Sequence, residues 1–201
     1  MEYPRRHQAF PDDKQLRFEP PHSDHAANSF GVWARLFYLL IPPGQPWHFV
    51  VVTKTGTRTR IREAAEAEEH EFYTHRASKE WLDALAPLGT NEEKPFLESA
   101  SCLIAIFLKK FSYTENGTKL KNYYPAESVG IASGLLIAAL HYAGVAMLTH
   151  TPSPMRFLNE ILERPKDERP YLLLVAGFPT ADAAVPDISR YDLKDIATFL
   201  E

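Results

Sequence analysis

The stretch from residue 126 to residue 154 constrains the fold most, because it joins an almost wholly apolar helix to a buried strand and a proline-rich turn. The helical part is apolar on nearly every side, so we expect it to be buried all round. Two glycines in its interior each cost about 1 kcal/mol relative to alanine, and close packing against a second helix, which can belong to another subunit, is expected to offset them. The small residues that would form this contact recur at every fourth position: Ala126, Gly130, Gly134 and Ala138.

Polar residues follow the strand that comes after this helix. Gly144 is predicted to end the helix in a left-handed conformation, and residues 145–148 are predicted to form a short buried strand. Thr149, His150 and Thr151 come next. The carboxyl end of a strand is where α/β proteins place ligands, so these three side chains are candidates for a binding site.

Length and charge narrow the possible classes of protein. The chain has 201 residues, 45% hydrophobic and 24% charged, which suits one globular domain. Its formal net charge of -4 and the lack of a Lys/Arg run do not favour DNA, RNA or a membrane surface as a partner. There is no apolar run of about 20 residues and no apparent signal peptide, so we expect a soluble, cytoplasmic protein. The lone Cys102 is expected to be a buried, inert thiol.

Residues 1–45 differ from the rest of the chain and are interpreted as a divergent or irregular segment that precedes the main domain at 46–201. Prolines interrupt the segment, and only residues 30–41 are apolar enough for a helix or a buried strand. His22 and His25 lie three positions apart, but no cysteine or carboxylate cluster joins them in a ligand pattern, so no metal site is predicted.

The remaining elements follow from hydrophobic periodicity and turn residues. Residues 59–77 predict a long amphipathic helix capped by Thr57 or Thr59, with an acidic face interpreted as solvated. A second helical piece is predicted at 79–88. The other predictions are strands at 47–53, 102–108 and 171–177, a turn at 115–117, a helix at 155–162, a loop at 183–190 and a terminal segment of undecided type at 193–200.

Five segments of the sequence together resemble the nitroreductase superfamily, and within it the iodotyrosine deiodinase branch: QPWHFVVV, EAEEHEFY, NYYPAESVGIASGLLIAALHYAGVAMLTHTPSP, FLNEILERPKDERPYLLLVAGFP and AAVPDISR. The resemblance covers roughly residues 45–195. It implies an α+β fold with a mixed sheet flanked by helices. It also implies an obligate homodimer with FMN at the subunit interface.

The resemblance implies that Glu69, Tyr73 and Lys94 bind the substrate. In this family a Glu-x3-Tyr pair with a later lysine forms a lid that grips the zwitterion of a halotyrosine. Glu69 and Tyr73 are four apart and therefore neighbours on one face of a helix. The chemistry is sound by itself, because an α-ammonium pairs with a carboxylate and an α-carboxylate pairs with an ammonium. The alternative is that these are ordinary residues of helix surfaces.

Several residues match the positions that bind FMN in the family. Thr149 and Thr151 match a Thr-x-Thr beside the flavin, where one hydroxyl can bond flavin N5, and His150 lies between them. Arg190 matches an arginine for the FMN phosphate, which a guanidinium can bind in a bidentate manner. Which threonine bonds N5 is left open. The alternatives are that the hydroxyls only cap the following turn and that Arg190 is an ordinary surface arginine.

The amino terminus departs from the family pattern. Arg5 and Arg6 match the start of its phosphate-binding motif, but His7 and Ala9 stand where the family has serine and arginine. Residues 43–45 are what remains of the family's loop over the flavin. Either another segment completes the phosphate site, or this terminus has diverged.

The resemblance therefore predicts an FMN-dependent reductive dehalogenase of halotyrosines. A general FMN nitroreductase or quinone reductase is the first alternative, since it would use the same threonines and Arg190 without the clamp. A non-catalytic dimeric relic with impaired flavin binding is the second. The electrons would come from a partner reductase or from NAD(P)H, and both sources stay open.

Overall fold

The computed structural model describes residues 18–19, 45–181, 183–184 and 189–200. The element predicted at 30–41, the two histidines at 22 and 25, and Arg5 and Arg6 lie outside the described residues.

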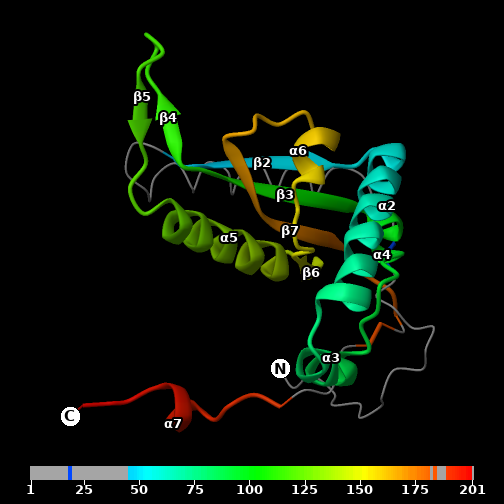
Figure 1. Ribbon diagram of the computed structural model, residues 1–201. Coiled ribbons are helices and arrows are strands. Elements are labelled where there is room, and N and C mark those ends of the chain that lie inside the picture. The colour runs from blue at the N-terminus through cyan, green and yellow to red at the C-terminus, as the bar shows by residue number, and fades with distance from the viewer. Residues whose placement is uncertain (1–17, 20–44, 182, 185–188, 201) are drawn as a thin grey trace.

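A five-stranded sheet forms the centre of the protein (Figure 1). Its strands are β1 (Phe18–Glu19), β2 (Trp47–Val52), β3 (Cys102–Lys109), β6 (Ala146–His150) and β7 (Glu168–Pro179). The strand order is β1-β7-β3-β2, and β6 also pairs with β7. Every strand pairing in the described part of the chain is antiparallel. The four strands predicted from the sequence are present, and β7 is longer than predicted.

β3 is buried on both of its faces, which explains its uninterrupted apolar sequence. Side chains alternate between the two faces of a strand, so a strand covered on both sides needs an apolar residue at every position. Leu103, Ala105 and Phe107 belong to one core cluster. Ile104, Ile106 and Leu108 belong to the other.

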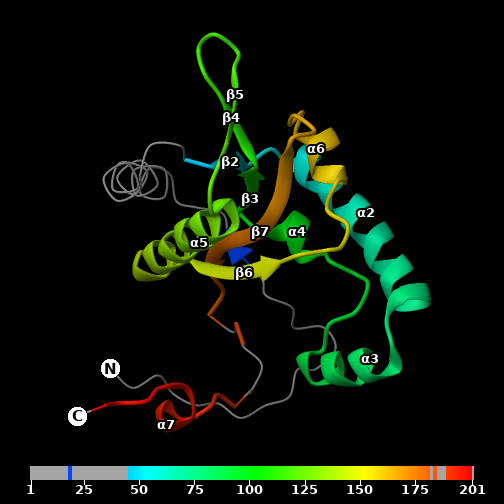
Figure 2. The same ribbon diagram turned by 60° about the vertical axis from the view of Figure 1, so that its left-hand side comes forward.

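Helices cover the two faces of the sheet (Figure 2). One face carries α2 (Thr55–Glu71), α4 (Phe96–Ser99) and α6 (Phe157–Ile161). Ile61, Leu97 and Leu158 anchor these three helices in the first core cluster. The opposite face carries α5 (Pro125–Tyr142), which contributes Val129 and Leu136 to the second. The structure therefore has the α+β architecture that the resemblance implied.

α2 differs from its prediction at both ends. It begins at Thr55 with Lys54 as its N-cap, without a side-chain cap, so the predicted start at Thr57 or Thr59 is wrong. It ends at Glu71 and continues as the π-helical turn η1 (Phe72–Arg76), closed by a 2.8 Å hydrogen bond from the Ala77 N–H to the Phe72 carbonyl. The wider turn allows the Arg76 guanidinium to donate to the carbonyl oxygens of Glu68 (2.6 Å) and Ser153 (2.8 Å).

The second helical piece was predicted at 79–88 and is confirmed. It consists of α3 (Lys79–Leu85) and the 3-10 turn η2 (Ala86–Leu88). The Ser78 hydroxyl caps α3 by accepting from the Trp81 N–H at 3.2 Å. Gly89 ends the turn with a φ of 61°, a conformation that favours glycine.

α5 is not buried all round within one chain. Gly144 follows it with a φ of 78°, as predicted. One side of the helix is exposed and apolar, with Ile131 61% and Leu135 43% accessible. Ala126, Gly134 and Ala138 lie on exposed positions as well. Gly130 differs from the other small residues because a Cβ there would lie in tight contact, 3.2 Å, with the Tyr171 hydroxyl oxygen of the same chain.

Two segments extend away from the sheet (Figure 1). β4 (Phe111–Tyr113) and β5 (Lys119–Lys121) form a hairpin around the predicted turn at 115–117. The C-terminal segment contains α7 (Leu193–Ile196) and has four exposed apolar side chains: Leu193, Ile196, Phe199 and Leu200. No helix among the described residues has the length and apolarity needed to cross a membrane.

Candidate active site

The three predicted clamp residues come together although they belong to different segments. Glu69 lies near the end of α2, Tyr73 lies in η1, and Lys94 lies just before α4. The Lys94 Nζ is 3.3 Å from the Glu69 Oε2. The same nitrogen is 5.6 Å from the centre of the Tyr73 ring. The fold thus gathers a cation, an anion and a phenol at one point.

Lys94 is held in an unusually buried position for a lysine. Its side chain is 3% exposed and that of Glu69 is 15% exposed. Its ammonium also donates to the Thr90 hydroxyl at 3.3 Å and to the Asn91 carbonyl. Burial lowers the pKa of Lys94, while the Glu69 carboxylate opposes this shift. The Glu69–Lys94 ion pair therefore keeps charge balanced in a poorly hydrated place.

Tyr73 shares the same shielded surroundings. Burial raises the pKa of its phenol, a hydrogen bond with Thr90 opposes the shift, and the Glu69 carboxylate adds to it. The phenol is a neutral donor and acceptor beside the charged pair.

The Thr-x-Thr turn has an alternating exposure. Thr149, at the end of β6, and Thr151 are exposed, whereas His150 between them is 9% exposed. The His150 Nε2 is buried and has no hydrogen-bond partner in the described part of the chain. Burial, and secondly the positive charge of Lys94, lowers the pKa of His150 to about 4. This histidine is therefore neutral at pH 7.

Two contacts place the threonine turn beside the clamp. The rings of Phe96 and His150 meet edge to face with their centres 5.7 Å apart. The Arg76 guanidinium reaches from η1 to the Ser153 carbonyl, two residues after Thr151. The predicted substrate residues and the threonine turn thus belong to one region.

The other candidates lie elsewhere or outside the described residues. Arg190 is exposed in the stretch before α7, and within the described residues no hydrogen bond or ion pair joins it to the threonine turn. Arg5 and Arg6 are not among the described residues. Cys102 is partly buried, and burial raises the pKa of its thiol, which fits the inert role predicted for it.

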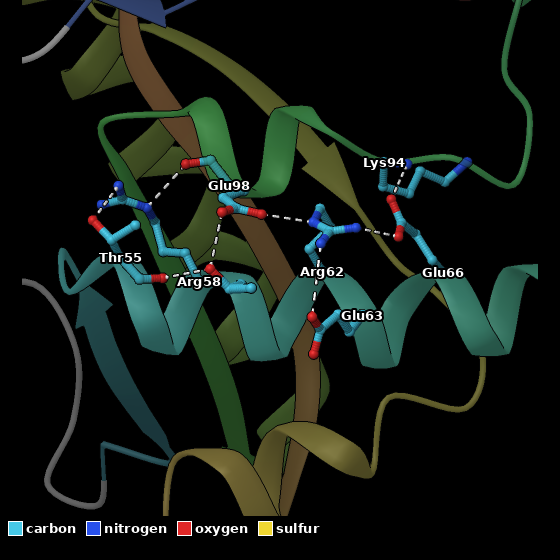
Figure 3. A network of polar contacts seen from close by, with 8 residues as sticks. Thr55, Arg58, Arg62, Glu63, Glu66, Lys94 and Glu98 are labelled. Carbon is cyan, nitrogen blue, oxygen red and sulfur yellow. Dashed lines mark hydrogen bonds and ion pairs between the residues drawn. The ribbon is translucent and has the colours of Figure 1, made fainter.

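A polar network runs along α2, on the acidic face that was predicted to be solvated. The Arg62 guanidinium bridges the carboxylates of Glu66 (2.6 Å) and Glu98 (2.7 Å), and Glu98 also accepts from the Thr59 hydroxyl at 3.0 Å. Figure 3 shows the side chains of Arg62, Glu66 and Glu98 lying between α2 and α4. The only sequence signal was the i, i+4 spacing of Arg62 and Glu66.

Comparison with known proteins decides the family. No family model matches the chain. An iodotyrosine deiodinase of Haliscomenobacter hydrossis is 55% identical over 148 residues, which is 74% of this chain and 67% of that protein. The chain belongs to the iodotyrosine deiodinase family. The family member of Danio rerio is 42% identical over 155 residues, 76% of this chain, and the match spans 52% of its length.

Solved structures agree with this assignment. The crystal structure of an iodotyrosine deiodinase bound to FMN and 3-iodo-L-tyrosine matches with a TM-score of 0.69 at 25% identity, over 92% of this chain and 94% of that one. The FMN-dependent nitroreductase NfnB of Mycobacterium smegmatis, in complex with NADPH, matches with a TM-score of 0.64 at 18% identity, over 92% and 93%. The second match shows the shared nitroreductase fold, in which the deiodinase family is one branch.

Proposed function

We propose that this deiodinase-family chain is an FMN-dependent oxidoreductase that removes the halogen from halotyrosines. The observation that carries the proposal is the meeting of Glu69, Tyr73 and Lys94 beside the Thr149–Thr151 turn. In the reaction the carbon–halogen bond breaks, two electrons and one proton enter, and tyrosine and a halide ion leave. FMN, when bound, supplies the two electrons, which come in turn from a partner reductase or from NAD(P)H.

The residues of the threonine turn fit a flavin. Two exposed hydroxyls flank a buried imidazole whose Nε2 has no partner among the described residues. The flavin ring carries several hydrogen-bond donors and acceptors, so it can bond to these two hydroxyls and to the imidazole. Thr149, His150 and Thr151 would contact the flavin ring, and Arg190 would contact its phosphate. Arg5 and Arg6 are proposed for the phosphate as well.

The clamp would act on the charged end of the substrate. The Lys94 ammonium would bind the α-carboxylate and the Glu69 carboxylate would bind the α-ammonium, with Tyr73 bonding to either. Before the substrate arrives, Glu69 and Lys94 neutralise one another at 3.3 Å. A zwitterion can enter between them and convert one ion pair into two, which a neutral aromatic compound cannot do.

The proposed function is tested with the purified protein loaded with FMN. We expect iodotyrosine to bind at least about tenfold more tightly than 2-iodophenol, which lacks the zwitterion, because a charge-assisted hydrogen bond contributes about 1.5 to 3 kcal/mol. Quenching of flavin fluorescence reports binding, and halide release reports turnover. Equal binding of the two compounds with turnover of nitroarenes would indicate a general nitroreductase instead. Colourless protein that cannot be loaded with FMN would indicate a non-catalytic relic.

We also propose that the chain forms a homodimer with FMN between its subunits. The exposed side of α5 presents Ile131 and Leu135 beside small residues, so a second helix can approach closely there. The exposed apolar side chains of the C-terminal segment supply further surface to bury. Both features are explained by a second copy of the chain.

Gly134→Leu is expected to weaken the dimer. A Cβ at Gly134 meets no atom within 4 Å, so the chain itself can accept the larger side chain. Overpacking a helix contact costs about 1 to 3 kcal/mol, or roughly 5- to 150-fold in the dimer Kd. Gly56 in α2, where an added Cβ also meets open space, provides the control variant Gly56→Leu. Analytical ultracentrifugation measures the two Kd values, and equal association of both variants would contradict the proposed interface.

A further inference from the structure

We propose that Glu66 is a positioning residue of the zwitterion clamp, because its carboxylate fixes the backbone from which Lys94 extends. This inference rests on the function proposed above. The Glu66 Oε1 accepts a hydrogen bond from the Lys94 backbone N–H at 2.8 Å (Figure 3). Glu66 thus holds the main chain of Lys94, while the Lys94 ammonium pairs with Glu69.

Glu66 is itself held in place by charge. Its other oxygen, Oε2, accepts from the Arg62 guanidinium at 2.6 Å. The Arg62 Nε donates to the Glu98 Oε2 at 2.7 Å. Glu98 lies in α4, which begins two residues after Lys94. The network therefore joins α2 to Lys94 through Glu66 and to α4 through Arg62. Arg62 and Glu66 are 26% and 25% exposed, so these bonds are partly shielded from water.

Glu66 and Glu69 act together on Lys94. Glu69 is three residues after Glu66, so both carboxylates lie on the same side of α2. One of them holds the Lys94 backbone and the other holds the Lys94 ammonium. A long lysine side chain has many rotamers, and fixing its backbone end restricts where its charge can go. Without Glu66 the ammonium would be less well placed to meet the substrate carboxylate.

The chain offers a matched control in Glu63. Glu63 lies on the same helix and also faces Arg62, at 3.8 Å, but its side chain is 62% exposed and no hydrogen bond within the described residues joins it to Lys94. Glu63→Ala therefore removes the same charge from α2 without touching the clamp. It controls for effects on the helix and on the net charge.

The test compares Glu66→Ala with Glu63→Ala in the FMN-loaded protein. We expect Glu66→Ala to raise the Kd and the KM for iodotyrosine by about three- to tenfold, with the Kd for 2-iodophenol and the flavin spectrum unchanged, because only the zwitterion meets Lys94. Glu63→Ala should match the wild type. Glu66→Gln, which keeps the shape and an acceptor oxygen for the Lys94 amide, should restore binding to within about threefold of wild type.

A second measurement does not depend on any substrate. Hydrogen exchange of the Lys94 amide should be about tenfold faster in Glu66→Ala and unchanged in Glu63→Ala, because the bond to Glu66 protects this amide. Equal exchange in the two variants, or a parallel loss of iodotyrosine and 2-iodophenol binding in Glu66→Ala, would overturn the positioning role. If the wild type itself does not prefer iodotyrosine, the proposed function fails, and the exchange measurement still decides the role of Glu66.

Discussion

Lys94→Ala is expected to weaken iodotyrosine binding by at least about tenfold while flavin loading and nitroarene turnover stay within a few-fold of wild type. The substitution removes the ammonium but not the backbone N–H that bonds Glu66, so the segment before α4 keeps its anchor. What is lost is one charge-assisted bond to the substrate carboxylate, in surroundings where the lysine side chain is 3% exposed. Shielding of this kind brings such a bond to about 1.5 to 3 kcal/mol.

Fluorescence titration of the flavin gives the Kd for iodotyrosine and for 2-iodophenol in each variant. Glu69→Gln should show the same selective loss, since it removes the other half of the clamp. Lys79→Ala, which removes an exposed lysine at the start of α3, should behave as wild type. A Lys94→Ala protein that binds iodotyrosine as well as its parent would show that the clamp does not hold the substrate.

His150→Gln is expected to flatten the pH dependence of stability between about pH 6.5 and pH 4. Burial holds the pKa of His150 at about 4, below its ordinary value of 6.5. Between these two values the unfolded chain binds a proton that the folded chain does not, so the free energy of unfolding falls as the pH falls. The stability is fully present above about pH 6.5, and about 3 kcal/mol is lost by about pH 4.

Denaturant unfolding at fixed protein concentration, at several values between pH 7.5 and pH 4.5, measures this difference. The quantity compared is the slope of the free energy of unfolding against pH, because a glutamine at a buried site can lower stability by the same amount at every pH. Burial opposes the ionisation of Glu168, but its hydrogen bond with Arg164 and the positive charges of Lys109 and Arg164 together lower its pKa, so Glu168 titrates at lower pH and remains in both proteins. The exposed His75 gives the control variant His75→Gln. Identical slopes for His150→Gln and wild type would contradict this account.

The main elements of the fold could be predicted from the sequence because they depend on local pattern. The uninterrupted apolar run at 102–108 predicts a strand covered on both faces, and β3 is indeed buried on both faces. Gly144 marks the end of α5 because this position has a positive φ, which glycine adopts without strain. By contrast, Lys54 at the start of α2 carries no capping side chain, and no local signal could have found it.

The candidate site was predictable only in part. Spacing alone placed Glu69 and Tyr73 near one another, whereas Lys94 came from the family resemblance, since its approach depends on the path of the whole segment from 72 to 93. The π-helical turn at Tyr73 was missed because it is stabilised by Arg76 reaching Ser153, 77 residues away. The partners of Glu66 and Arg62 in the network are 28 and 36 residues distant, and a single helix pattern does not contain such information.

The central place of β7 has a consequence for the protein as it is being synthesised. β7 occupies residues 168–179 and pairs with β1, β3 and β6, all of which precede it in the chain. Until the ribosome has made β7, one edge of the apolar strand β3 has no neighbour, and β6 has no pairing partner among the described strands. Unpaired apolar edges attract other chains. The nascent protein therefore exposes this apolar edge from the synthesis of β3, which ends at Lys109, until the synthesis of β7, which begins at Glu168. We expect shielding by chaperones during that interval to raise the yield of folded protein.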